Sequence, residues 1–175
     1  HAPASSGIDL DNRSYFGLQA GIRENGGLFF HASTWAIIAE TILGRNEDAY
    51  SLYRRELPTI RNDKVDDCLI EPYVYASSMV APCHEKNYMG VNSWLSGTAS
   101  WMYLAATQYI LGFRPDYDGV IIDPCVPMEW DGFKYTRIYR ETKVEVVSGK
   151  IPIEGARSKM LSVDGVKVEG NFVPA

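Results

Sequence analysis

The sequence predicts a mainly helical region, residues 1–115, followed by a small β region, residues 116–175. Two observations support this division. Before residue 115, apolar residues recur at helical spacing in several segments. After it, short β-branched or alternating runs are separated by Gly, Pro and Asp. Because helices and strands are segregated along the chain, the pattern favours two subregions over an alternating α/β fold.

The first helix is expected to begin near Ser33, after a polar and turn-rich loop that contains Gly21, Gly26 and Gly27. Gly44 stands where a C-terminal cap belongs. The residues that would share one face of this helix are Trp35, Ile38 and Ile42.

Three more helices and four strands follow. Asn46, an N-cap residue ahead of two acids, begins the second helix, and Pro58 stops it. Residues 71–76 favour a third helix, because proline is tolerated in a first turn. Residues 98–111 form the fourth, which is apolar on nearly every side and therefore predicts burial between layers. The expected strands cover residues 120–122, 135–139, 143–147 and 163–168.

Composition excludes several classes of protein. The 175 residues are 46% hydrophobic and 22% charged, which is typical of a globular chain with a buried core. The net charge is -5, and 17 basic residues are scattered among 22 acidic ones, so no basic stripe suits nucleic acid. No apolar run approaches the ~18 residues of a membrane span, and no signal-peptide pattern opens the chain. The three cysteines include no CxxC pair, so we expect reduced thiols, no metal site and a cytoplasmic protein.

One cluster of chemically useful residues lies between Arg23 and His31, where charge, amide, glycine, aromatic and imidazole groups fall within nine residues. Glycines there would let the backbone approach a ligand, and His31 near a helix start could donate to an anion. A tight turn with a capping histidine explains the same residues.

Two further clusters carry polar groups. Residues 92–101 combine hydroxyl side chains and a glycine ahead of the fourth helix, which suits phosphate but equally suits simple Ser/Thr capping. Residues 71–75, Glu-Pro-Tyr-Val-Tyr, place an acid beside aromatic rings, which suits a sugar, although core tyrosines explain it as well. His84 beside Glu85 has no third ligand at useful spacing, so no metal is expected there.

Taken together and in this order, seven motifs resemble the phosphorylases of glycoside hydrolase family 94, which includes cellobiose and chitobiose phosphorylases. The motifs span residues 21 to about 140, whereas the last 35 residues are much less diagnostic. They are Glu24-Asn-Gly-Gly-Leu-Phe-Phe-His31, Glu71-Pro-Tyr-Val-Tyr75, Asn92-Ser-Trp-Leu-Ser-Gly-Thr-Ala-Ser-Trp101, Gln108-Tyr-Ile-Leu-Gly112, Arg114-Pro, Tyr117-Asp-Gly and Ile122-Asp-Pro-Cys125.

The resemblance implies the closing helices of an (α/α)6 barrel, followed by a small jelly-roll-like β region. It also implies reversible, inverting phosphorolysis of a β-linked disaccharide or oligosaccharide to an α-sugar 1-phosphate. Phosphate is then a co-substrate, and no other cofactor is expected. An inverting hydrolase activates water with a second carboxylate, whereas a phosphorylase replaces that group with residues that hold an anion.

The resemblance also implies roles for particular residues. His31 looks like the phosphate-binding histidine, and Ser96 with Gly97 looks like a Thr-Gly pair in which serine keeps the hydroxyl. Arg23 and Glu24 are expected at the acceptor sugar. The remaining sugar contacts are expected from Tyr73 and Ser77, although the family usually carries glutamine at the position of Ser77.

The aspartate that serves the family as general acid lies on the order of 150 residues before the histidine, so no catalytic residue is expected within these 175 residues. We therefore expect a C-terminal fragment that is inactive alone, whose partners are the rest of the enzyme and a second copy in a homodimer. Alternatives are a phosphorylase for another β-glucan or an aldonic-acid disaccharide, and a non-catalytic carbohydrate-binding module of the same fold.

Overall fold

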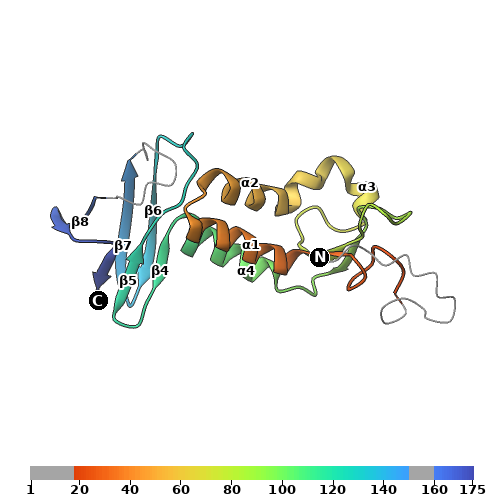
Figure 1. Ribbon diagram of the computed structural model, residues 1–175. Helices are drawn as coiled ribbons and strands as arrows, with labels where there is room; N and C mark the ends of the chain where they lie inside the picture. Colours follow the sequence, from red (N-terminus) through yellow and green to blue (C-terminus); the bar gives the residue numbers. More distant parts are fainter. Residues whose placement is uncertain (1–17, 150–159) are drawn as a thin grey trace. The chain divides into compact units, whose positions relative to one another are not determined.

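The computed structural model describes residues 18–149 and 160–175 (Figure 1). The chain forms two compact units, and each is described by itself. Unit 1 contains the described part of His1–Ala36 together with Leu52–Tyr103. Unit 2 contains Ile37–Ser51 and the described part of Leu104–Ala175. Within these residues, no helix has both the length and the apolar character needed to cross a membrane.

The structure contains helices and several small antiparallel sheets, which confirms the predicted class in its coarse form. The predicted first, second and fourth helices are present. The first ends directly before Gly44 and the second two residues before Pro58, whereas the fourth is α-helical to Leu104 and continues as a π-helix to Ile110. The helices are α1 (Phe30–Leu43), α2 (Asn46–Glu56), the 3-10 helix η2 (Pro58–Lys64), α3 (Val65–Cys68), α4 (Thr98–Leu104) and the π-helix η3 (Ala105–Ile110).

The predicted helix over residues 71–76 is wrong. The backbone N–H of Val74 donates to the carbonyl of Glu71 over 3.1 Å, which closes a single turn, and the chain then becomes extended. That extended segment, β2 (Ala76–Met79), is the middle strand of a sheet in the order β1-β2-β3, with β1 (Leu28–Phe29) and β3 (Gly90–Ser93) as its antiparallel neighbours. Residues 71–75 form a turn and irregular backbone, and only Ala76 of the predicted helix belongs to the strand, where it pairs with Ser93.

Helix α1 buries a different face from the one that the sequence predicts. Trp35 and Ile42 are 52% and 53% exposed. The residues of α1 that are buried are Phe30, Thr34, Ile37 and Thr41. Helix α4 also departs from the prediction of burial on every side, because Tyr103 is 60% exposed. Both helices therefore leave aromatic side chains uncovered.

Asn46 begins α2 as predicted, but its side chain bonds to a later segment of the chain and does not cap the helix. Its Nδ2 donates to the Val126 carbonyl over 3.0 Å, and its Oδ1 accepts from the Cys125 thiol at 3.1 Å. The first helical bond of α2 instead runs from the Ala49 N–H to the Arg45 carbonyl. The amide of Asn46 thus anchors the helix to a later segment of unit 2.

Unit 2 builds its β structure from a sheet in the order β10-β5-β4 and two hairpins. Phe113, Val120 and Ile122 form its core with aromatic and aliphatic side chains of the hairpins, including Tyr135 and Val144. Three of the four predicted strands are present, those over residues 120–122, 135–139 and 143–147. The fourth, residues 163–168, is wrong as a single strand, because Asp164 and Gly165 have positive φ angles and turn the chain between β8 and β9. Strands β4 and β10 were not predicted. The strands are β4 (Phe113–Pro115), β5 (Gly119–Ile122), β6 (Gly132–Tyr139), β7 (Thr142–Gly149), β8 (Leu161–Val163), β9 (Val166–Val168) and β10 (Phe172–Pro174).

Candidate functional site

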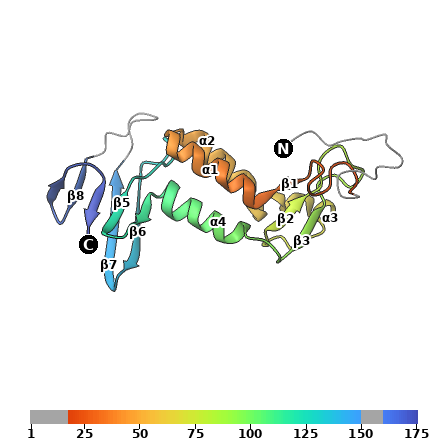
Figure 2. The same cartoon turned by 60° about the horizontal axis from the view of Figure 1, so that its bottom comes forward.

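The β1-β2-β3 sheet of unit 1 brings parts of the three predicted clusters to one end, namely His31, Ser77 and the chain that leads to Ser96. Phe29 pairs with Ser78, and Ala76 pairs with Ser93. Because neighbouring strands are antiparallel, the end of β1, the start of β2 and the end of β3 lie at the same end of the sheet. His31 follows β1, Ser77 lies at the start of β2, and the chain toward Ser96 leaves from the end of β3. Figure 2 shows α1 and α4 both starting from this sheet.

A row of aromatic rings joins His31 to Gly97. The imidazole centroid of His31 lies 5.9 Å from the ring of Trp35, which lies 6.0 Å from the ring of Trp101, both in edge-to-face contact. A Cβ on Gly97 would lie 3.7 Å from Cδ1 of Trp101. Edge-to-face pairs hold rings in a defined geometry, so these contacts fix α1 against α4 beside both predicted phosphate ligands.

Hydroxyl groups are concentrated where α4 begins. The Oγ of Ser96 accepts the N–H of Thr98 over 3.0 Å and lies 2.6 Å from the Oγ1 of Thr98. Ser96 is half-buried, Gly97 is exposed, and Thr98 is fully buried. The local capping that the sequence offered as an alternative is therefore present, and it leaves Gly97 open to solvent.

Trp94, two residues before Ser96, forms an exposed aromatic pair with Tyr73. The indole Nε1 of Trp94 donates to Oε1 of Glu71 over 2.8 Å, and the ring of Tyr73 lies 6.2 Å from that of Trp94. This hydrogen bond lowers the pKa of the Glu71 carboxyl. Tyr73 and Trp94 are 69% and 70% exposed, so neither is a core residue. The bond ties the Glu71 motif to the motif that carries Ser96, a link that the sequence did not predict.

Arg23 and Glu24 lie in the loop before β1, at the other end of that strand from His31. Both side chains are exposed. The loop is wound by backbone hydrogen bonds, from Gly27 N–H to the Arg23 carbonyl over 2.8 Å and from Gly21 N–H to the Asn25 carbonyl over 2.7 Å. Their predicted role at the acceptor remains a prediction.

The family model described as "Glycosyl hydrolase 94 superfamily, catalytic domain" matches residues 1–112, which include the three clusters. The chain belongs to the glycosyl hydrolase 94 superfamily. An N,N'-diacetylchitobiose phosphorylase of Vibrio proteolyticus is 33% identical over 88% of this chain. A solabiose phosphorylase of Paenibacillus borealis is 34% identical over 90% of it. A 3-O-beta-D-glucopyranosyl-beta-D-glucuronide phosphorylase of Paenibacillus borealis is 32% identical over 73% of it.

The chain spans only about a fifth of these superfamily members, namely 19%, 21% and 17% of their respective lengths. Among the residues that the structure describes, no group of three His, Cys, Asp or Glu side chains is placed to hold a metal ion.

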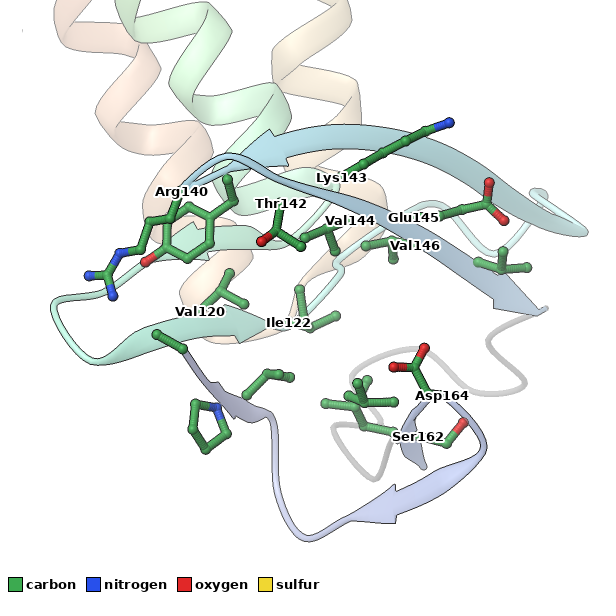
Figure 3. Close-up of a pocket in the computed structure, with 17 residues that line it drawn as sticks. Val120, Ile122, Arg140, Thr142, Lys143, Val144, Glu145, Val146, Ser162 and Asp164 are labelled. Atoms are coloured by element: carbon green, nitrogen blue, oxygen red, sulfur yellow. The ribbon is translucent and has the colours of Figure 1, made fainter.

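A hollow of about 650 Å³ in unit 2 contains none of the predicted site residues. Its inner wall is largely aliphatic, with Val120, Ile122, Val144 and Val146 directed into it (Figure 3). Tyr139 also lines it, but the hydroxyl of that tyrosine already donates to backbone carbonyls of unit 2. Polar and charged side chains such as Arg140 and Asp164 also line the hollow, but none of its lining residues belongs to the positions predicted to bind phosphate or sugar.

A half-buried cluster of ionisable side chains, Glu56, Arg61 and Tyr75, lies beside the start of α1 in this superfamily member. The Arg61 guanidinium lies 4.8 Å from the ring centre of Phe30, the residue before His31. Burial raises the pKa of Glu56 to about 7, and the charge of Arg61 opposes that rise. Burial also raises the pKa of Tyr75 to about 12. Oε2 of Glu56 and Nη2 of Arg61 are buried and have no hydrogen-bond partner in the described part of the chain.

The raised pKa of Glu56 predicts that the stability of unit 1 depends on pH. Its pKa is about 7 in the folded chain, against 4.5 for an ordinary glutamate. Between these values the folded state holds a proton that the unfolded state has lost, so the stabilisation is complete below pH 4.5 and is lost as the pH rises through 7. We expect Glu56→Gln to remove that loss, which is on the order of 3 kcal/mol.

Urea unfolding of the chain at several pH values, followed by tryptophan fluorescence, measures this effect. Glu85→Gln replaces an exposed carboxylate and should keep the pH dependence of the unsubstituted chain. The same decline in the Glu56→Gln variant would contradict the assignment.

Proposed function

We propose that this chain is the C-terminal portion of an inverting β-glycoside phosphorylase, to which it contributes the phosphate site and part of the sugar site. One observation supports this most directly: the β1-β2-β3 sheet gathers His31, Ser77 and the chain leading to Ser96 at one end. In this proposal, His31, Ser96 and Gly97 hold phosphate. Inorganic phosphate is the only co-substrate that the reaction needs besides the saccharide.

The residue types suit an anionic nucleophile. In the proposed reaction a phosphate oxygen attacks the anomeric carbon from the face opposite the leaving group, and the C–O bond to the acceptor breaks. A general acid elsewhere in the enzyme gives its proton to the leaving oxygen, which yields an α-sugar 1-phosphate. An imidazole N–H and a hydroxyl can donate to phosphate, whereas a carboxylate in their place would repel it.

Exposed aromatic side chains support the proposal that the rest of an (α/α)6 barrel covers these helices. Trp35 and Tyr103 are 52% and 60% exposed, and such surfaces are usually covered by another part of a protein. We place the general acid in that remaining part, so the chain alone is proposed to be inactive. A homodimer and a cytoplasmic location belong to the same proposal.

The test is a pair of substitutions in the complete enzyme that contains this chain. His31→Ala should lower kcat/KM for phosphate by about 100-fold, the usual cost of losing an aligned donor to a reacting anion. Gly97→Ala should fold normally, because the nearest atom to the new methyl is 3.7 Å away. It should nevertheless raise the KM for phosphate at least about tenfold, because the methyl fills the space that the anion approaches. Release of sugar 1-phosphate from β-disaccharides provides the assay.

Gly149→Ala is the matched control, because a Cβ there meets nothing within 4 Å and the residue lies in unit 2. It should leave both kinetic constants unchanged. An unchanged response to phosphate in the His31→Ala and Gly97→Ala enzymes would refute the phosphate site. Saccharide binding without any phosphate-dependent cleavage would favour a carbohydrate-binding module instead.

An acidic acceptor is the second candidate. Arg23 is an exposed cation beside Glu24 in the loop proposed to face the acceptor, and one of the relatives is named for a glucuronide. Comparing cellobiose with cellobionic acid as substrates separates the two. Arg23→Gln should weaken only the acidic substrate if the guanidinium binds its carboxylate.

A further inference from the structure

Thr98 is a polar residue in a fully buried position. Its exposed fraction is 0%, and a buried hydroxyl requires hydrogen-bond partners. Two oxygen atoms are within reach: Oγ of Ser96 at 2.6 Å, where either hydroxyl can donate, and the carbonyl of Ala76 at 3.4 Å, which can only accept from Thr98. The first contact is short and the second is long, so the strong partner of Thr98 is the hydroxyl of Ser96.

The hydroxyl of Ser96 has one proton and two acceptor sites. One acceptor site is already used by the backbone N–H of Thr98, at 3.0 Å. The direction of the bond between the two hydroxyls decides where the remaining proton of Ser96 points. If Ser96 donates to Thr98, that proton is unavailable to a ligand. If Thr98 donates to Ser96, it gives up its long bond to the Ala76 carbonyl, both acceptor sites of Ser96 are filled, and the Ser96 proton is free for an anion.

We propose that Thr98 is a positioning residue, whose hydroxyl donates to Ser96 and thereby directs the Ser96 proton to the phosphate nucleophile. This inference rests on the proposed function. A phosphate oxygen offers only acceptor sites, so its arrival favours the arrangement in which Thr98 donates. The result is a chain of hydrogen bonds from Thr98 through Ser96 to phosphate, in which each bond strengthens the next. Thr98 itself touches no substrate in this arrangement.

Thr98→Val in the complete enzyme is the main test, because valine keeps the shape and the backbone N–H while it removes the hydroxyl. The KM for phosphate should rise about tenfold, the effect of one hydrogen bond of ordinary strength. The KM for the disaccharide should not change. Thr98→Ser, which keeps the hydroxyl, should restore the KM for phosphate to within about threefold of the unsubstituted enzyme.

A double-mutant cycle shows whether Thr98 acts through Ser96. In a Ser96→Ala enzyme, the added Thr98→Val substitution should have no further effect on the KM for phosphate. An equal further loss in that background would overturn the proposal, as would an unchanged KM in Thr98→Val alone. Thr98→Ala gives the same comparison if valine disturbs folding. If His31→Ala and Ser96→Ala both leave the KM for phosphate unchanged, the proposed function itself fails, which is a different result from failure of the Thr98 link.

Discussion

Replacing Gly112 with alanine is expected to destabilise unit 2 by about 3 kcal/mol or more, through backbone strain and a direct clash. Gly112 has a φ of +75°, in the left-handed region, at the end of the π-helix η3. A Cβ there would lie 2.2 Å from both the Asp123 carbonyl carbon and the Pro124 nitrogen. These are backbone atoms, so no side-chain rotation can relieve the overlap. The Gly112 carbonyl also accepts the N–H of Asp123 over 2.8 Å, which holds the backbone of Gly112 close to that of Asp123.

The control is Gly165→Ala. Gly165 has a φ of +82° as well, but a Cβ there meets nothing within 4 Å. It should cost only the strain of a left-handed alanine, roughly 1 kcal/mol. Trp130 lies in unit 2, 5.6 Å from the ring of Tyr50, so its fluorescence reports the unfolding of that unit. Equal midpoints of denaturation for the two variants would show that the clash at Gly112 is absent in solution.

Gly27→Ala is expected to disable the acceptor side of the site while it spares the phosphate side. A Cβ on Gly27 would lie 2.5 Å from the Arg23 nitrogen and 2.7 Å from the Arg23 oxygen, again backbone atoms. Arg23 already has a φ of +47°, which is unusual for a residue other than glycine. The loop must therefore unwind, which moves Arg23 and Glu24. We expect kcat/KM for the disaccharide to fall on the order of 100-fold, the scale of a misplaced binding group.

Kinetics of the complete enzyme separate the two sides of the site. The KM for phosphate in the Gly27→Ala enzyme should stay within about threefold of its original value, which corresponds to a change of less than about 1 kcal/mol in the free energy of phosphate binding. Gly97→Ala should give the opposite pattern, so each variant is the control for the other. If Gly27→Ala raises both KM values equally, the loop supports the whole unit and has no separate role at the acceptor.

Local signals predicted the helix ends well. Gly44 and Pro58 act on their immediate neighbours, and the first two predicted helices end at or just before them. The β1-β2-β3 sheet could not be predicted, because its strands are only two to four residues long and its pairing joins distant segments. The helix over residues 71–76 was wrongly predicted from Pro72, because proline suits the first turn of a helix and also an isolated turn.

The order of the motifs identified the candidate site residues, since no single motif was long enough to do so. That His31, Ser77 and the chain leading to Ser96 lie at one end of a sheet depends on non-local pairing, which could not be predicted from spacing. Thr98 was missed because a hydroxyl that positions another hydroxyl looks, in sequence, like ordinary capping. The contact between Trp35 and Trp101 was missed because helical periodicity shows which residues share a face but not what that face meets.

The central strand of the β10-β5-β4 sheet has a consequence for how the protein is made. Gly119–Ile122 pairs on one edge with Phe172–Pro174, about 50 residues later in the chain. At ordinary rates of synthesis, this partner follows after roughly 3–10 s. During that interval one edge of β5, which carries Val120 and Ile122, has no partner strand. We expect this nascent strand to be the segment of unit 2 that most needs a chaperone, until Phe172–Pro174 has been synthesised and can pair with it.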